Sequence, residues 1–107
     1  MTHKLKHTPG PWECDLDYIV APDPDGRHPD IYIAEIATED SEGRVASVEQ
    51  QIANRQLITA APEMLEALVL AQRALNTAPR FRVGDTDSYA IAAIVDTAIT
   101  TATVITE

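Results

Sequence analysis

The chain has 107 residues, 45% of them hydrophobic, and seventeen acidic against eight basic side chains give it a net charge of −9 at pH 7. Two separate cores would each be too small to bury enough apolar surface. The negative charge disfavours direct binding to nucleic acid or to anionic membranes, since both are bound through Lys and Arg. We therefore predict a single domain over residues 1–107, with residues 1–10 as a flexible N-terminal arm.

Cysteine content and segment hydropathy indicate the compartment. Cys14 is the only cysteine, so no intrachain disulfide is possible and a reducing compartment suits the chain. The basic N-terminal residues lead into Thr8-Pro9-Gly10-Pro11 and not into an apolar run, which argues against a signal peptide. No apolar stretch reaches the roughly 18–20 residues of a membrane span. These features predict a cytoplasmic protein.

Short strand-like segments separated by turn residues form the first part of the chain. Residues 12–21 predict one strand, because apolar and acidic side chains alternate there. Residues 22–30 contain three prolines and a glycine and predict a connection. Residues 31–37 have the β-branched and aromatic content typical of a central strand. Residues 44–46 are either a short third strand or the lead-in to a helix.

The period becomes helical at Ser47. This residue predicts the N-cap of a helix over residues 47–61, with Gln50 as its capping-box partner. Pro62 must end or kink that helix and is well suited to begin a second one, over residues 62–76.

A third helix is predicted near the C-terminus. Residues 84–88 predict a turn and a helix cap, and residues 88–104 follow with apolar side chains at steps of three and four. Threonines near the end of this segment are poor helix formers, so the last turn either frays or is a strand.

These elements predict an α+β fold. Two or three antiparallel strands would be covered on one face by the corner between helices 47–61 and 62–76, with the third helix at the C-terminus. The helices carry more apolar residues than a small sheet can cover. This surplus favours a homodimer or larger assembly, unless the apolar faces pack on each other. The expected oligomer face holds Leu65, Leu68, Leu75, Ile91 and Val95.

Two motifs carry a resemblance to a known family. The first is His7-Thr8-Pro9-Gly10-Pro11-Trp12, and the second reads NRQLITAAPEMLEAL over residues 54–68, with Ala34-Glu35-Ile36-Ala37 between them. Over residues 7–75 the chain resembles a family of small accessory proteins from tailed phages and prophages. The resemblance implies a product that acts inside an infected or lysogenised bacterial cell, and it carries over no activity and no catalytic residue.

The same motifs have plain structural interpretations. Trp12 would cover the edge of the core, and Asn54 and Arg55 would lie on the polar side of a helix. The alternative is a small binding patch, with further contacts from the connecting loop. The candidate binding residues are Trp12, Asp23, Asp25, Asn54 and Arg55.

No recognised catalytic or metal-binding pattern occurs in the sequence. The aspartates of residues 23–30 resemble a fragment of a calcium loop but lack its closing Glu. Cys14 is expected to be a buried thiol that packs as a small hydrophobic group, not a nucleophile paired with a histidine. Phosphate-binding glycine loops and hydrolase motifs are absent from the sequence. We expect no enzyme activity, no catalytic residues, no metal and no cofactor.

The leading functional hypothesis is a phage-encoded binding protein. It would inhibit or modulate a host protein by occluding a basic surface that handles nucleic acid, as an anti-CRISPR-like factor does to a defence component. A second hypothesis is a sponge that sequesters a small signalling nucleotide in a pocket at a subunit interface. A third is a structural or assembly role in the virion. The arginines available to the nucleotide site are Arg27, Arg44, Arg55, Arg80 and Arg82.

Overall fold

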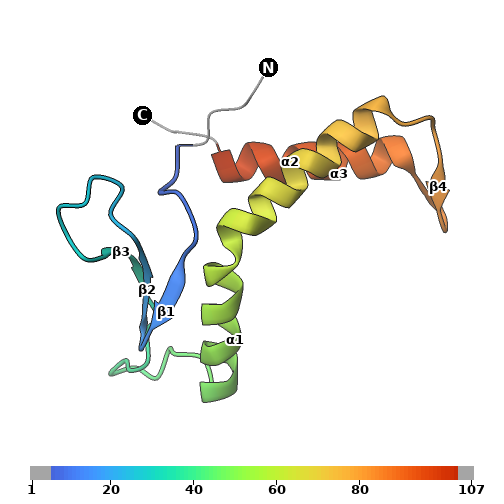
Figure 1. Cartoon of the computed structure of the whole chain (residues 1–107). Helices are drawn as coiled ribbons and strands as arrows, with labels where there is room; N and C mark the ends of the chain where they lie inside the picture. Colours follow the sequence, from blue (N-terminus) through green and yellow to red (C-terminus); the bar gives the residue numbers. More distant parts are fainter. Residues whose placement is uncertain (1–5, 104–107) are drawn as a thin grey trace. The chain divides into compact units, whose positions relative to one another are not determined.

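The computed structural model describes residues 6–103, and these form two compact units (Figure 1). The first, here called the sheet unit, spans residues 8–63 and holds three strands and helix α1. The second, here called the helical unit, covers residues 6–7 and 64–103 and holds most of α2, a small hairpin and α3. Strands in the N-terminal half and helices in the C-terminal half confirm the predicted α+β class. No helix within residues 6–103 combines the length and hydropathy that crossing a membrane requires.

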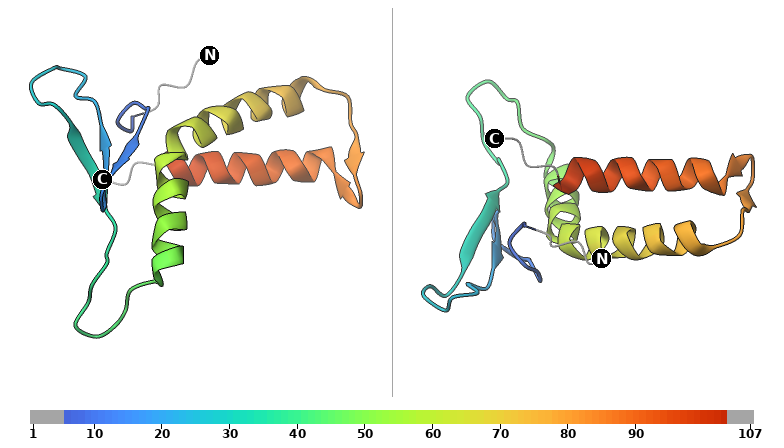
Figure 2. Two further views of the ribbon diagram at one scale, coloured as in Figure 1. Left: turned by 60° about the horizontal axis from the view of Figure 1, so that its bottom comes forward. Right: turned by 90° about the horizontal axis from the view of Figure 1, so that it is seen from above.

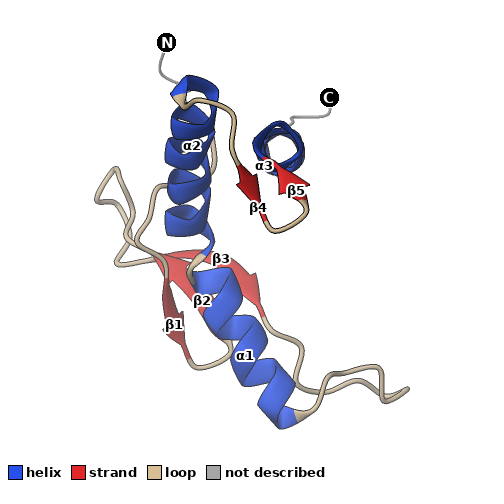
Figure 3. Ribbon diagram, turned by 90° about the vertical axis from the view of Figure 1, so that its right-hand side faces the viewer, coloured by secondary structure: helices blue, strands red, loops and turns tan. Residues whose placement is uncertain are grey.

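The sheet unit is built on an antiparallel sheet in the order β1-β2-β3 (Figure 3). Its strands are β1 (Glu13–Asp15), β2 (Tyr18–Ala21) and β3 (Ile31–Glu35). The middle strand β2 is buried, with Ile19 and Ala21 at 0% exposure and Val20 at 4%. The prediction of a central strand after residue 30 is therefore wrong, because β3 lies at an edge of the sheet.

The predicted single strand over residues 12–21 is also wrong, because it folds back as a hairpin. The chain turns at Leu16 and Asp17, so that Asp15 pairs with Tyr18 and Cys14 with Ile19. Leu16 adopts a φ of 55°, a backbone conformation that favours glycine, and its side chain is 84% exposed. The turn has a leucine, and not the usual glycine or asparagine, at its left-handed position.

Substituting Leu16 with glycine is expected to raise the free energy of unfolding by about 0.5–1 kcal/mol. Left-handed backbone costs a bulky residue about 1–2 kcal/mol, and the greater chain entropy of glycine offsets part of that relief. Urea unfolding measures the difference. Leu16→Ala is the control, since alanine keeps the Cβ strain and loses only an exposed side chain. A glycine variant that is no more stable than the alanine variant would contradict the prediction.

Helix α1 (Val48–Thr59) begins as predicted. The Ser47 hydroxyl accepts a hydrogen bond from the Gln50 amide, and the Gln50 side-chain oxygen accepts one from the Ser47 amide, each at 3.2 Å. Residues 44–46 are a loop that leads into this helix. α1 packs against β1 and β2, yet Val48 is 70% exposed.

In the helical unit, α2 (Ala61–Thr77) and α3 (Ser88–Thr103) lie side by side (Figure 2). A hairpin of two short strands, β4 (Arg82–Val83) and β5 (Thr86–Asp87), joins them where a turn was predicted. Gly84 in its two-residue loop has a φ of 59°, which glycine adopts readily. The predicted helices agree closely with α2 and α3, and the expected helical end beyond Thr103 lies outside the described residues.

The cap of α3 lies within the predicted turn-and-cap segment, residues 84–88. Asp87 Oδ1 accepts a hydrogen bond from the Tyr89 amide at 2.8 Å and so caps the helix. Ser88 instead pairs with Phe81: its amide donates to the Phe81 carbonyl at 2.7 Å, and its hydroxyl accepts from the Phe81 amide at 3.0 Å. Ser88 therefore fastens the base of the hairpin, which the sequence motif alone did not reveal.

The residues of the expected oligomer face are not freely exposed. Leu65 is buried at 8% exposure, and the other four are half-buried. Gln72 Nε2 donates a hydrogen bond to Asp96 Oδ1 at 2.8 Å, linking α2 to α3. The apolar side chains with most exposure on these helices are Leu70 and Ile94, at 64% and 66%. A homodimer stays a prediction.

Candidate functional site

The sheet unit carries most of the negative charge of the chain. It contains twelve acidic side chains and three arginines, whereas the helical unit contains four acidic side chains and three arginines within residues 64–103. Two of the three arginines already have acidic partners. Arg44 Nε lies 2.9 Å from Asp40 Oδ2, and Arg55 Nη1 lies 3.4 Å from Asp17 Oδ1. The sheet unit therefore presents a strongly negative surface whose local cations are largely neutralised.

One face of the sheet, here called the tyrosine face, holds two tyrosines and three carboxylates. Asp15 is opposite Tyr18, and Tyr18 is opposite Glu35, and directly opposed side chains share a face. Glu13 lies two residues from Asp15 and so shares that face. The rings of Tyr18 and Tyr32 are stacked, with centroids 4.8 Å apart and planes at 21°.

α1 packs on the sheet face opposite the tyrosine face. On that opposite face, Cys14 Sγ lies 3.0 Å from the Thr59 hydroxyl of α1. Tyr32 is 70% exposed, and the three carboxylates are also exposed. The strands β1, β2 and β3 contain no lysine or arginine. The exposed Tyr32 ring and the exposed carboxylates together suit a cationic protein surface.

Electrostatics on this face act on Tyr18. The negative charge of Glu35 raises the pKa of the Tyr18 hydroxyl, because a phenolate there would lie beside a carboxylate, and partial desolvation raises it further. Tyr18 is therefore neutral at physiological pH and leaves the negative charge of the face to its carboxylates.

The predicted burial of Cys14 is wrong, because Cys14 is exposed. The hairpin makes β1 a short edge strand, which leaves this side chain at the rim of the sheet. Its sulfur also lies 3.8 Å from the Arg55 carbonyl, to which the thiol donates. Within residues 6–103, no group of three or more His, Cys, Asp or Glu side chains is placed to hold a metal ion.

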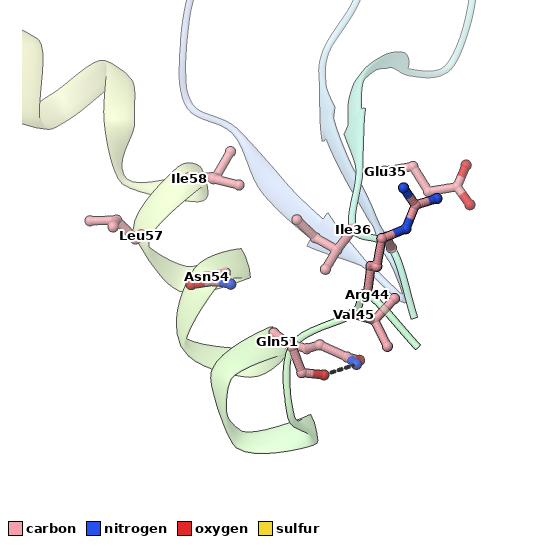
Figure 4. A pocket seen from close by; sticks show the side chains of 10 residues that line it. Glu35, Ile36, Arg44, Val45, Gln51, Asn54, Leu57 and Ile58 are labelled. Carbon is pink, nitrogen blue, oxygen red and sulfur yellow. Dashed lines mark hydrogen bonds between the residues drawn. The ribbon is translucent and has the colours of Figure 1, made fainter. Parts of the chain in front are cut away.

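A pocket of about 320 Å³ lies between α1 and the chain that follows β3 (Figure 4). Its walls are mainly apolar, and the one buried amide, Gln51, is satisfied by a 2.8 Å hydrogen bond to the Ala46 carbonyl. Arg44 is the only cation of the lining, and its guanidinium also lies 3.4 Å from Glu42. The pocket thus offers no uncommitted cation to a phosphate. Its lining is Glu35, Ile36, Ala37, Arg44, Val45, Ala46, Gln51, Asn54, Leu57 and Ile58.

The predicted binding residues of the two motifs have separate surroundings. Trp12 is half-buried and donates from Nε1 to the Thr8 carbonyl at 3.1 Å. Arg55 pairs with Asp17 at the hairpin turn. Of the five predicted binding residues, only Asn54 lines the pocket. The tyrosine face was missed by sequence reasoning, because a continuous first strand placed Tyr18 on a buried face.

The loop aspartates differ from each other. The Asp23 carboxylate accepts hydrogen bonds from three backbone amides of its own loop, at 2.9–3.0 Å, and these hold the loop closed. The same bonds, led by that from the Asp25 amide, lower the pKa of Asp23. The Asp25 side chain is exposed. Asp23 is therefore engaged in organising the loop, and Asp25 faces solvent.

Stability is expected to fall when the pH drops below about 4, near the ordinary aspartate pKa. Hydrogen bonds from Arg80 and from the Tyr89 amide lower the pKa of Asp87 in the folded chain. A lowered folded pKa contributes stability that is present above the unfolded pKa and is lost as pH falls through the folded pKa. Urea unfolding from pH 7 to pH 2.5 measures the decline. Asp87→Asn should be less stable at pH 7 and decline less; an identical pH profile would contradict this assignment.

The two sequence motifs meet in the sheet unit. A Cβ added at Gly10 would lie 3.0 Å from Pro62 Cβ and 3.4 Å from Glu63 Oε1. The Pro9-Gly10-Pro11 segment therefore packs against the start of α2, where only a residue without a side chain fits undisturbed.

A family model described as Salmonella phage P22 protein Y8K6 matches residues 1–104. No curated protein and no solved structure matches the chain.

Proposed function

The chain belongs to the family of Salmonella phage P22 protein Y8K6, and we propose that it serves a phage as a binding protein that inhibits or modulates a host protein. Its target is a basic surface that handles nucleic acid, such as that of an anti-phage defence component in the bacterial cytoplasm. The observation that carries the proposal is the concentration of negative charge in the sheet unit, where most of the arginines are already paired.

Charge of this kind acts in two ways on such a target. It speeds encounter with a positive surface, since complementary fields steer diffusion. It also occupies the same lysines and arginines that a nucleic acid needs for its phosphates. A protein with these properties inhibits by occlusion and needs no active site.

Affinity capture from host lysate tests the proposal. Capture is performed at about 0.1 M salt, where the Debye length is about 10 Å, and repeated at about 1 M, where it is about 3 Å. We expect a nucleic-acid-binding host protein to be retained at low salt and released at high salt. The purified target should then lose affinity for nucleic acid when the phage protein is added.

Matched variants make the test specific. Glu13→Lys with Asp15→Lys reverses two exposed charges of the sheet unit, and should abolish capture. Glu66→Lys with Asp85→Lys reverses two exposed charges of the helical unit and should leave capture intact. Equal capture by both double variants, or a captured target whose nucleic-acid binding is unchanged, would refute occlusion by the sheet unit.

A further inference from the structure

We infer that the tyrosine face binds arginine side chains of its partner in preference to lysine side chains. This inference rests on the proposed function, because it takes the partner surface to be basic. The selection arises at Tyr32. One side of its ring is covered by the stacked Tyr18 ring, and its 70% exposure leaves the other side open to a partner.

An open tyrosine ring discriminates between the two cations. The guanidinium of arginine is planar and weakly hydrated, so it stacks flat on an aromatic ring, whereas the ammonium of lysine is compact and strongly hydrated. The chain contains an example of this contact, because Arg80 Cζ lies 4.7 Å from the centroid of the Tyr89 ring. Tyr89 is itself 63% exposed, so the stack forms at the surface.

Carboxylates share the tyrosine face with the stacked rings. Glu13 and Asp15 are exposed on β1, which is separated from Tyr32 by β2, and neither side chain forms a hydrogen bond or ion pair with another residue in the described range 6–103. A carboxylate accepts two parallel hydrogen bonds from one guanidinium. An ammonium cannot donate such a parallel pair. These carboxylates are therefore acceptors for further arginines of a partner whose first arginine stacks on Tyr32.

Charge complementarity argues against two other partners for the tyrosine face. A second copy of the chain would bring its own acidic sheet unit and would be repelled. A nucleic acid could stack a base on Tyr32, but its phosphates would meet the carboxylates of the tyrosine face. An arginine-bearing protein segment satisfies both the ring and the carboxylates.

Two blocked peptides of equal length and charge test the inference on the full chain, one alternating glycine with arginine and the other glycine with lysine. Binding is measured by titration calorimetry at about 0.1 M salt. The arginine peptide should bind more tightly, by up to the roughly two- to five-fold that one exposed cation–π contact of about 0.5–1 kcal/mol supplies, because lysine makes a weaker contact of the same kind. Tyr32→Leu should lower the ratio of the two affinities, while Tyr32→Phe, which keeps the ring, should preserve it.

Tyr89→Leu is the matched control, because it removes an exposed tyrosine of the helical unit, and should leave the ratio unchanged. Equal affinities for the two peptides, or a ratio that survives Tyr32→Leu, would overturn the arginine selection and leave the proposed occlusion standing. Failure of both peptides to bind, in the unaltered chain and at low salt, would refute the acidic docking surface itself and the selection with it.

Discussion

Replacing Ile19 with alanine is expected to lower the free energy of unfolding by about 2–5 kcal/mol, the usual cost of truncating a buried isoleucine. Ile19 is fully buried in the middle strand of the sheet, between its pairing partners Cys14 and Ala34. Both partners are small, so neither can fill the cavity that the missing atoms leave. Urea unfolding monitored by circular dichroism gives the difference.

The control for this prediction is Ile94→Ala, which makes the same chemical change at a side chain that is 66% exposed. It should alter stability by no more than about 0.5 kcal/mol. If the two variants lost equal stability, the sheet would not be the main core of its unit.

Replacing Gly10 with alanine is expected to cost about 1–3 kcal/mol, as overpacking does in a well-fitted site. The added methyl group would press on the Pro62 ring at 3.0 Å, and Pro62 is buried at the start of α2. A rigid, buried ring cannot swing aside as a flexible side chain would. The loss is measured by thermal or urea unfolding.

A double-mutant cycle identifies the cause of that loss. Pro62→Gly removes the Cβ that the new methyl group would meet, so Gly10→Ala should cost clearly less in the Pro62→Gly background. Additive losses in the double variant would show that Gly10 is required for another reason.

Local signals explain the parts of the fold that the sequence predicted correctly. The Ser47 and Gln50 capping box acts within one turn, and the helix break near Pro62 follows from its missing amide. The hairpin at Leu16 was missed because the alternation of side chains runs through it and a leucine occupies the left-handed position. The β4 and β5 strands, with two residues each, are too short to show any period.

The candidate site was less predictable, because it depends on contacts between strands. Composition indicated an acidic docking protein. The binding residues proposed from the motifs, such as Trp12 and Arg55, instead form hydrogen bonds or ion pairs with other residues of the sheet unit. Tyr18 and Tyr32 are separated by thirteen residues that include a loop, and only the strand register shows that their rings stack. Pairing register is set by tertiary packing and not by the short segments themselves.

The irregular register of β3 determines which side chains the sheet offers to its surroundings. Ile19 pairs with Ala34 but Val20 pairs with Tyr32, so Ile33 is an extra residue in the ladder. In a regular ladder Val20 would pair with Ile33, and Tyr32 would turn inward beneath α1. One inserted residue thus places Tyr32 beside Tyr18 where a regular ladder would place Ile33, and its removal would exchange a second aromatic ring for an aliphatic side chain on that surface.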